Sequence, residues 1–168
     1  MDTLSASVLR DRKPQIGIVL GSGLGALAER IEGAEALPYS DIPGFPVSTA
    51  PEHKGRFVFG TIGDKEVVLM DGRVHLYEGY TPQQVVMPIR LMRQMGIHTV
   101  LLTNASGGIR RDLHAGDLML LTDHISSLVP SPLRGENDPS LGVRFPDMRH
   151  VYDEDLQRLF RQTAKALD

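Results

Sequence analysis

Two groups of polar residues in this chain have the types and the spacing that bind a small anion. The first is the glycine turn Gly21–Gly25, which follows an apolar run and precedes a helix-like stretch. Backbone amides at a glycine-rich helix N-terminus point toward an anion and favour negative charge. Ser22, inside the turn, adds a hydroxyl donor. The pattern predicts that a phosphate group binds at this turn.

The second group lies in the stretch DGRVHLYEGY, residues 71–80. In an extended backbone, Arg73, His75 and Tyr77 point the same way. Arginine offers a bidentate fork to phosphate, and histidine adds a donor whose charge changes near neutral pH. Glu78 is expected to orient His75 or to neutralise surplus positive charge. The alternative is a surface hairpin that carries these side chains by chance.

Two further stretches could complete an anion site. Residues 103–108, TNASGG, follow an apolar run, and their small side chains let the backbone approach a ligand closely. His53, Lys54 and Arg56 lie around a glycine just before another apolar run. A plain turn and a solvated basic turn are the alternatives for these two stretches. His124 is interpreted as a structural histidine.

The glycine turn also fits the loose dinucleotide-binding pattern, with Ala26 in its last position. That reading needs an acidic residue at the end of the next strand, about twenty residues after the glycines. Asp41 is near that distance, but it sits in LPYSDIPGFP, a stretch with three prolines that cannot be the second strand of a βαβ unit. A free phosphate is therefore favoured, and a Rossmann oxidoreductase is set aside.

Apolar strand-like runs alternate with helical runs, which is typical of an α/β fold. We expect a mixed, largely parallel β-sheet flanked by helices. Thr81 and Gln84 form the pattern of a capping box at the start of one helix, which Pro88 is expected to kink or shorten. Three methionines on that helix are assigned to core packing, namely Met87, Met92 and Met95. Strands are predicted at 16–20, 56–62, 66–70, 99–103 and 118–122, and helices at 24–31, 81–96 and after Asp153.

Composition restricts the classes of protein. The 168 residues are interpreted as a single domain, 1–168, and the net charge of −3 gives no reason to expect a nucleic acid or membrane partner. The absence of cysteine excludes disulfides, thiolate metal sites and a cysteine nucleophile. A polar N-terminus and the lack of a long apolar segment predict a cytoplasmic protein. The last helix runs to Asp168 with an apolar face, so we expect the domain to be truncated at its C-terminus.

Taken together and in order, these motifs resemble the purine nucleoside phosphorylase family of the trimeric, inosine- and guanosine-preferring type. The resemblance runs from about Pro14 to the end of the chain and rests on GSGLG, HKGR, GRVHLYEGY, TNASGG and SPLRGEND…RFPDM…YD. The family has Ala-Ala-Gly-Gly where this chain has Ala-Ser-Gly-Gly at 105–108.

The resemblance implies reversible phosphorolysis of purine nucleosides to free base and ribose 1-phosphate, in purine salvage, by a homotrimer. Inorganic phosphate is then a co-substrate, and no cofactor or metal is expected. The resemblance also implies that the residues that recognise the base lie in a later half of the protein. This chain therefore resembles the N-terminal portion of the family length, and base specificity cannot be inferred from it.

The resemblance further assigns roles to individual residues. His75 and Glu78 are implied as catalytic residues, and Tyr77 as a contact to the ribose. Phe145 resembles a residue that crosses a subunit boundary to cover the sugar of a neighbouring site. The implied phosphate ligands are Ser22, His53, Arg73, His75 and the backbone amide of Ala105.

Two other functions stay open at this point. A methylthioadenosine phosphorylase is the nearest alternative within the class, although Tyr77-Glu78-Gly79 after Gly72-Arg73 favours the first reading by resemblance. A nonenzymatic phosphate- or nucleoside-binding fragment is the alternative from another class. Cleavage of inosine that depends on phosphate separates the enzyme from the binding fragment.

Overall fold

The computed structural model describes residues 13–48 and 54–167. They belong to two compact units, Met1–Ser106 and Gly107–Asp168, and each is described by itself. The interpretation of residues 1–168 as one domain stays a prediction.

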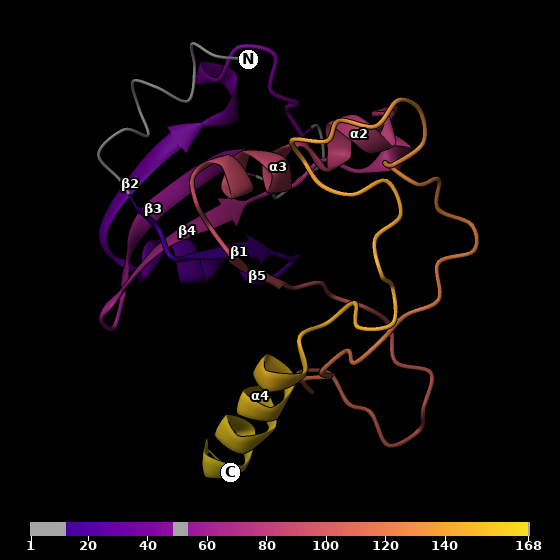
Figure 1. Ribbon diagram of the computed structural model, residues 1–168. Helices are drawn as coiled ribbons and strands as arrows, with labels where there is room; N and C mark the ends of the chain where they lie inside the picture. Colours follow the sequence, from indigo (N-terminus) through magenta and orange to yellow (C-terminus); the bar gives the residue numbers. More distant parts are fainter. Residues whose placement is uncertain (1–12, 49–53, 168) are drawn as a thin grey trace. The chain divides into compact units, whose positions relative to one another are not determined.

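The first unit is built on a mixed sheet of five strands in the order β2-β3-β4-β1-β5 (Figure 1). Strand β1 lies between β4 and β5 and pairs in parallel with both. The pairs β2/β3 and β3/β4 are antiparallel. The mixed α/β sheet expected from the sequence is therefore confirmed. The strands are β1 (Ile16–Leu20), β2 (Glu32–Pro38), β3 (Arg56–Ile62), β4 (Lys65–Asp71) and β5 (Thr99–Leu102).

This pairing brings four chain segments to one edge of the sheet. Because β1, β4 and β5 run in the same direction, their carboxyl ends lie together. Because β3 is antiparallel to β4, its amino end lies at the same edge, where Arg56 is the register partner of Asp71. The glycine turn and the residues that follow β4 and β5 consequently start from neighbouring points.

Four of the predicted strands are confirmed, two of them with the same bounds. The fifth prediction, 118–122, is wrong, because these residues form no strand. Their apolar side chains are exposed, Leu118 to 98%. A strand needs a neighbour for its backbone N–H and C=O groups, and no described segment pairs with this run. Its apolar composition alone could not supply that neighbour.

Strand β2 was not predicted from the sequence. Its residues Glu32-Gly33-Ala34-Glu35 lack apolar alternation, and six of its seven positions are exposed. It forms at the edge of the sheet through backbone pairing with β3, with an irregularity between Glu32 and Glu35. A strand that buries so little has no hydrophobic pattern to read.

Two helices are shorter than the sequence predicts, whereas the helix predicted after Asp153 is present as α4 (Glu154–Leu167). The expected helix at 24–31 is a five-residue 3₁₀ helix, η1 (Gly25–Glu29). The expected helix at 81–96 is divided into α2 (Pro82–Val85) and α3 (Met87–Gln94), as the internal Pro88 predicts. The Thr81–Gln84 capping box is present, with the backbone N–H of Thr81 2.9 Å from Gln84 Oε1. The remaining elements are η2 (Tyr39–Asp41) and η3 (Leu76–Glu78).

Both faces of the sheet in this unit are covered. One face packs an aromatic cluster, in which the rings of Tyr39, Phe45 and Phe57 lie within 5.5 Å of one another, together with Met92 of α3. The fully buried Met92 and the partly buried Met87 and Met95 confirm the core role predicted for these methionines. The opposite face packs η1 against apolar residues of the strands, namely Ile18, Leu20, Val58, Val67 and Leu69 with Ala28 and Ile31.

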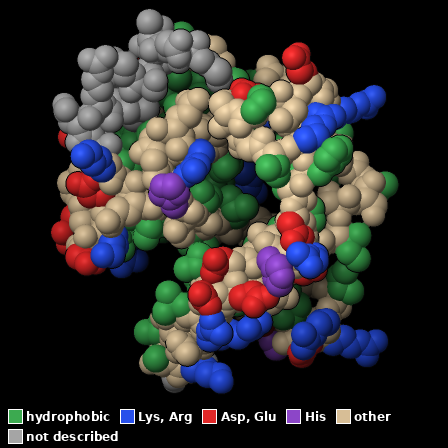
Figure 2. Space-filling model, viewed as in Figure 1, with side chains coloured by type: hydrophobic (Ala, Val, Ile, Leu, Met, Phe, Trp, Pro, Cys, Tyr) green, Lys and Arg blue, Asp and Glu red, His purple; other side chains and the backbone are tan. Residues whose placement is uncertain are grey.

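The second unit consists of α4 and long loops. Many of its large apolar side chains are exposed, among them Ile109, Ile125, Leu128 and Phe145. Arg144 donates to the carbonyl oxygens of Leu133 and Gly135 and so closes a loop. Over the face shown in Figure 2, positive and negative side chains are intermixed, in keeping with the small net charge. No helix among the residues that the structure describes has the length and apolarity needed to cross a membrane.

Candidate functional site

The side chain of Arg73 crosses the carboxyl ends of the neighbouring strands. Its Nη1 lies 3.1 Å from the carbonyl oxygen of Thr103, after β5, and 3.4 Å from that of Leu20, at the end of β1. The guanidinium group follows β4 and reaches over β1 to β5, in the order that the sheet sets. The charge is thereby held beside the start of the glycine turn.

Thr103 joins the glycine turn to the end of β5. Its hydroxyl accepts a hydrogen bond from the Gly21 N–H at 2.8 Å and donates to Val19 O at 2.8 Å. A Cβ on Gly21 would lie 2.6 Å from Asn104 Cα, so only glycine permits this approach. The three segments predicted to hold one anion are therefore brought together: the glycine turn, the Arg73 strand end and the turn after Thr103.

A small cavity of about 30 Å³ lies under the glycine turn. Its size suits about one water molecule. Ser22, one of the predicted ligands, lines the cavity. Asp71 lines it from the end of strand β4. The full lining is Leu20, Gly21, Ser22, Gly23, Gly25, Asp71 and Gly72.

Glu78 fixes the orientation of His75. One carboxylate oxygen, Oε1, accepts the backbone N–H of His75 at 2.7 Å and lies 2.9 Å from the ring Nδ1. The other oxygen accepts from the Ser48 hydroxyl at 3.2 Å. Both contacts at Oε1 hold the imidazole ring and the His75 backbone against the same carboxylate oxygen. The Glu78 side chain is 2% exposed, so the ring is held against a nearly buried carboxylate.

The sequence-based expectation of an extended backbone through Tyr77 is wrong, because the chain is no longer extended from Leu76 onward. The chain turns into η3 there, because the Glu78 N–H donates to His75 O at 3.1 Å and the Glu78 side chain returns to the His75 N–H. Tyr77 nevertheless lies against His75, with ring centroids 4.7 Å apart and an interplanar angle of 19°. The phenol is 77% exposed and available to a ligand.

The remaining predicted residues are His53, Ala105 and Phe145. His53 falls outside the described residues. Ala105 belongs to an exposed turn, which the Ser106 hydroxyl closes by donating to Asn104 Oδ1 at 2.6 Å. Phe145 belongs to the second unit, where the residue is 86% exposed. The guanidinium carbon of Arg144 lies 5.9 Å from the centroid of the Phe145 ring.

His124 pairs with Tyr152 within the second unit. Its Nδ1 lies 3.1 Å from the Tyr152 hydroxyl, and the two rings meet edge to face. This contact is consistent with the structural interpretation of His124. It ties the residues after the apolar run at 118–122 to the chain just before α4.

Sequence reasoning missed an ion-pair network beside the glycine-turn cavity. Arg56 Nε donates to Asp71 Oδ2 at 2.9 Å, and its Nη2 donates to Glu29 Oε1 at 2.7 Å. Lys54 also pairs with Glu29. The signal was present in the two-residue turn Gly63-Asp64, because a hairpin closed there places Arg56 opposite Asp71.

Tyr39 is a second residue that the sequence did not reveal. Tyr39 is buried, with 1% of the residue exposed. Its hydroxyl donates to the carbonyl oxygen of Gly72 at 2.7 Å, and Gly72 directly precedes Arg73. Burial raises the pKa of this hydroxyl far above its ordinary value of 10.0, and the charge of Asp71 raises it further. The hydroxyl therefore stays a neutral donor and supports the turn that carries Arg73.

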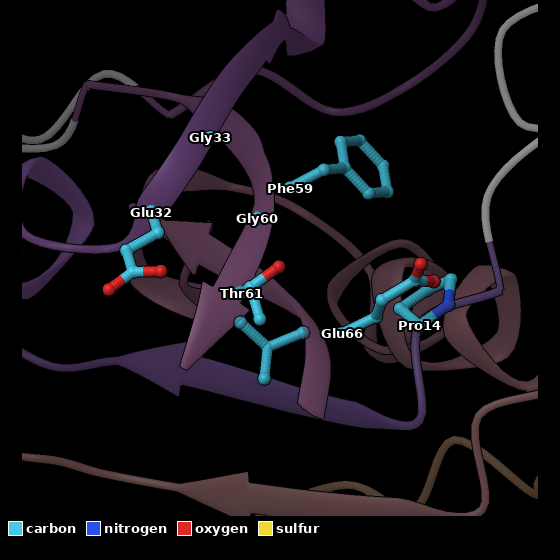
Figure 3. Close-up of a pocket in the computed structure, with 8 residues that line it drawn as sticks. Pro14, Glu32, Gly33, Phe59, Gly60, Thr61 and Glu66 are labelled. Carbon is cyan, nitrogen blue, oxygen red and sulfur yellow. The ribbon is translucent and has the colours of Figure 1, made fainter. Parts of the chain in front are cut away.

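Another cavity of the first unit lies away from this site. It has a volume of about 320 Å³, and none of the residues predicted for the site lines it (Figure 3). Pro14 precedes β1 and Glu66 lies near the start of β4, so this cavity is at the opposite ends of these strands. Among the described residues, no group of three or more His, Asp or Glu side chains is arranged to hold a metal ion.

Residues 15–168 match the family model of the phosphorylase superfamily. Purine nucleoside phosphorylase 1 of Geobacillus stearothermophilus is 49% identical over 151 residues, which cover 90% of this chain and 55% of that protein. Purine nucleoside phosphorylase of Bos taurus is 42% identical over 162 residues, 94% of this chain and 55% of that protein.

Solved structures agree with these relatives. A purine nucleoside phosphorylase from Schistosoma mansoni in complex with acetate superposes with a TM-score of 0.86 at 40% identity, over 94% of this chain and 59% of that one. A schistosome purine nucleoside phosphorylase in complex with hypoxanthine superposes with a TM-score of 0.85 at 41% identity. The match covers 94% of this chain and 56% of that one. The chain spans about half the length of the curated relatives it matches.

Proposed function

The chain belongs to the phosphorylase superfamily, and on that premise we propose that it supplies the phosphate-binding part of a purine nucleoside phosphorylase. The reaction is reversible phosphorolysis of inosine- and guanosine-type nucleosides to free purine and ribose 1-phosphate. The observation that carries the proposal is the Arg73 guanidinium, held between the ends of β1 and β5 beside the glycine turn. The printed names of the relatives and the complexes of schistosome enzymes with hypoxanthine and ribose 1-phosphate support it.

In this proposal the protein positions one dianion under the sugar. Breaking the bond between C1′ and the purine nitrogen leaves positive charge on the ribose, and the base departs with the electron pair. A phosphate oxygen then forms the new bond to C1′. Arg73 supplies the permanent charge, while Ser22, His53, His75 and the amide of Ala105 supply further donors. Positioning and the exclusion of water account for most of the expected rate enhancement.

The other predicted residues act around this dianion. Glu78 keeps the His75 ring oriented through the contact at Nδ1. Tyr77 lies along the ribose, and Phe145 of a neighbouring subunit covers the sugar. The reaction uses inorganic phosphate as co-substrate and needs no cofactor. A homotrimer and a cytoplasmic location belong to the same proposal, and sedimentation of the purified protein tests the assembly.

The proposal is tested by inosine cleavage with two proteins. One is this chain, and the other is this chain continued by the remaining part of the Geobacillus stearothermophilus relative, called the extended chain. We expect the extended chain to release hypoxanthine from inosine only when phosphate is present, and this chain to bind phosphate. The matched control is the extended chain with Arg73→Ala.

Three results would contradict the proposal. Cleavage that proceeds equally without phosphate would make the protein a hydrolase. Release of adenine from methylthioadenosine, with inosine untouched, would favour the methylthioadenosine phosphorylase. If the extended chain binds phosphate but releases no base, the protein would be a nonenzymatic binding module.

A further inference from the structure

A carboxylate lies against the glycine turn, where the anion is proposed to bind. Asp71 is buried, with 3% of the residue exposed. Its Oδ1 lies 3.4 Å from the position that a Cβ on Gly25 would occupy, so this oxygen faces the glycine turn. A buried negative charge repels a dianion strongly because little water screens the two charges. An anion site built this way needs a compensating positive charge.

Arg56 supplies that charge from the neighbouring strand. It lies opposite Asp71 in the β3/β4 register, and its Nε donates to Asp71 Oδ2 at 2.9 Å. A second donor, Nη2, binds Glu29 at the end of η1. One guanidinium group therefore connects the end of β4, which precedes Arg73, with the 3₁₀ helix that follows the glycine turn.

We propose that Arg56 is a positioning residue of the phosphate site, which neutralises the Asp71 carboxylate beneath the glycine turn and thereby allows a dianion to bind there. This inference rests on the proposed function, because it assumes that phosphate occupies the glycine turn. Arg56 does not touch the phosphate. It acts through the charge of the Asp71 carboxylate.

The charge balance distinguishes this role from a purely structural one. Replacing Arg56 with methionine keeps an unbranched apolar stem but leaves the Asp71 charge unpaired next to the dianion. Replacing Asp71 with asparagine in the same protein removes that charge again. Phosphate binding should therefore be lost in R56M and restored in R56M/D71N. A structural role would weaken binding in both variants, because the link to Glu29 is absent from both.

The experiment is calorimetric titration of the full chain with inorganic phosphate. We expect the Kd of R56M to rise by about tenfold or more, and that of R56M/D71N to return to within about threefold of the unmodified chain. The matched control is K65M, which removes one positive charge at the far end of β4, where Lys65 pairs with Asp64. Thermal unfolding of each variant shows whether it is folded.

Each outcome decides between the proposals. A double variant that binds as weakly as R56M, or an R56M that binds as tightly as K65M, overturns this inference and leaves the proposed function intact. If the unmodified chain binds no phosphate, the proposed function and this inference both fail. If R56M does not fold, D71N decides instead: binding at least as tight as in the unmodified chain supports the inference, and weaker binding overturns it.

Discussion

Thr103 and Arg73 meet at a backbone carbonyl: Thr103 O lies 3.1 Å from Arg73 Nη1. The hydroxyl of the same threonine accepts the Gly21 N–H at 2.8 Å. One residue thus holds both the guanidinium group and the first residue of the glycine turn. The donors are set by hydrogen bonds within the protein, so binding of an anion requires little rearrangement.

Replacement of Arg73 by alanine should reduce phosphorolysis by the extended chain. Arg73 carries the permanent positive charge of the proposed site and spans three strand ends. We expect kcat/KM to fall by about 10²-fold or more, the scale for removal of one charge-stabilising donor. Arg73→Lys should recover only part of it, since lysine lacks the planar fork. A near-normal Arg73→Ala enzyme would rule out the central role of this residue.

Substitutions of Glu78 should reduce catalysis by removing the group that orients His75. Glu78→Ala removes the acceptor for both the His75 backbone N–H and its ring Nδ1. We expect a loss of about 10- to 100-fold in kcat/KM, equivalent to one charge-assisted hydrogen bond. Glu78→Gln keeps a neutral acceptor and should lose less. Steady-state kinetics of the extended chain with inosine measures both, and equal activity of all three proteins would contradict the assignment.

Alanine at Gly21 should disturb the site, whereas alanine at Gly17 should be tolerated better. At Gly21 the added Cβ would meet backbone, 2.6 Å from Asn104 Cα. At Gly17 it would meet the flexible end of Met92, 2.7 Å from Sδ. We expect Gly21→Ala to lower the free energy of unfolding by about 1–3 kcal/mol and to weaken phosphate binding. Urea unfolding and calorimetry test this, and a Gly21→Ala chain as stable as Gly17→Ala would refute it.

Tyr39→Phe should weaken the support of the turn before Arg73. The variant loses the hydroxyl that donates to Gly72 O at 2.7 Å, and we expect about 1 kcal/mol less stability at neutral pH. Tyr80→Phe is the control, because that hydroxyl bonds Val47 at the surface and should contribute less. Urea midpoints for the two variants measure the difference. Equal midpoints would show that the buried hydroxyl adds nothing.

The same tyrosine predicts a loss of stability in alkaline solution. The pKa of Tyr39 in the folded protein is raised above its ordinary value of 10.0 by burial and then by Asp71. A raised folded-state pKa stabilises the protein fully below the unfolded-state value, and this stabilisation is lost as the pH rises above about 10. The decline in the unfolding midpoint above that pH should be shallower in Tyr39→Phe. Identical profiles would contradict it.

Much of the candidate site can be proposed from the sequence because its signals are local. The bounds of β1 and β3 follow from apolar runs, and the glycine turn and the Arg73–Glu78 cluster follow from residue types at short spacing. The edge strand β2 carries no such pattern, since it is held by backbone pairing. The run at 118–122 carries the pattern but pairs with no described strand.

The sequence by itself determined which polar residues follow each buried strand, because strand ends and turns depend on residues close together in the chain. Only the tertiary structure decided that these ends meet at one edge of the sheet, that β3 returns antiparallel, and that Arg56 faces the buried Asp71. The physical reason is that strand order and register arise from hydrogen bonds and packing between segments far apart in sequence. Those contacts, more than residue type, turn a lone carboxylate and a lone guanidinium into a pair beneath the glycine turn.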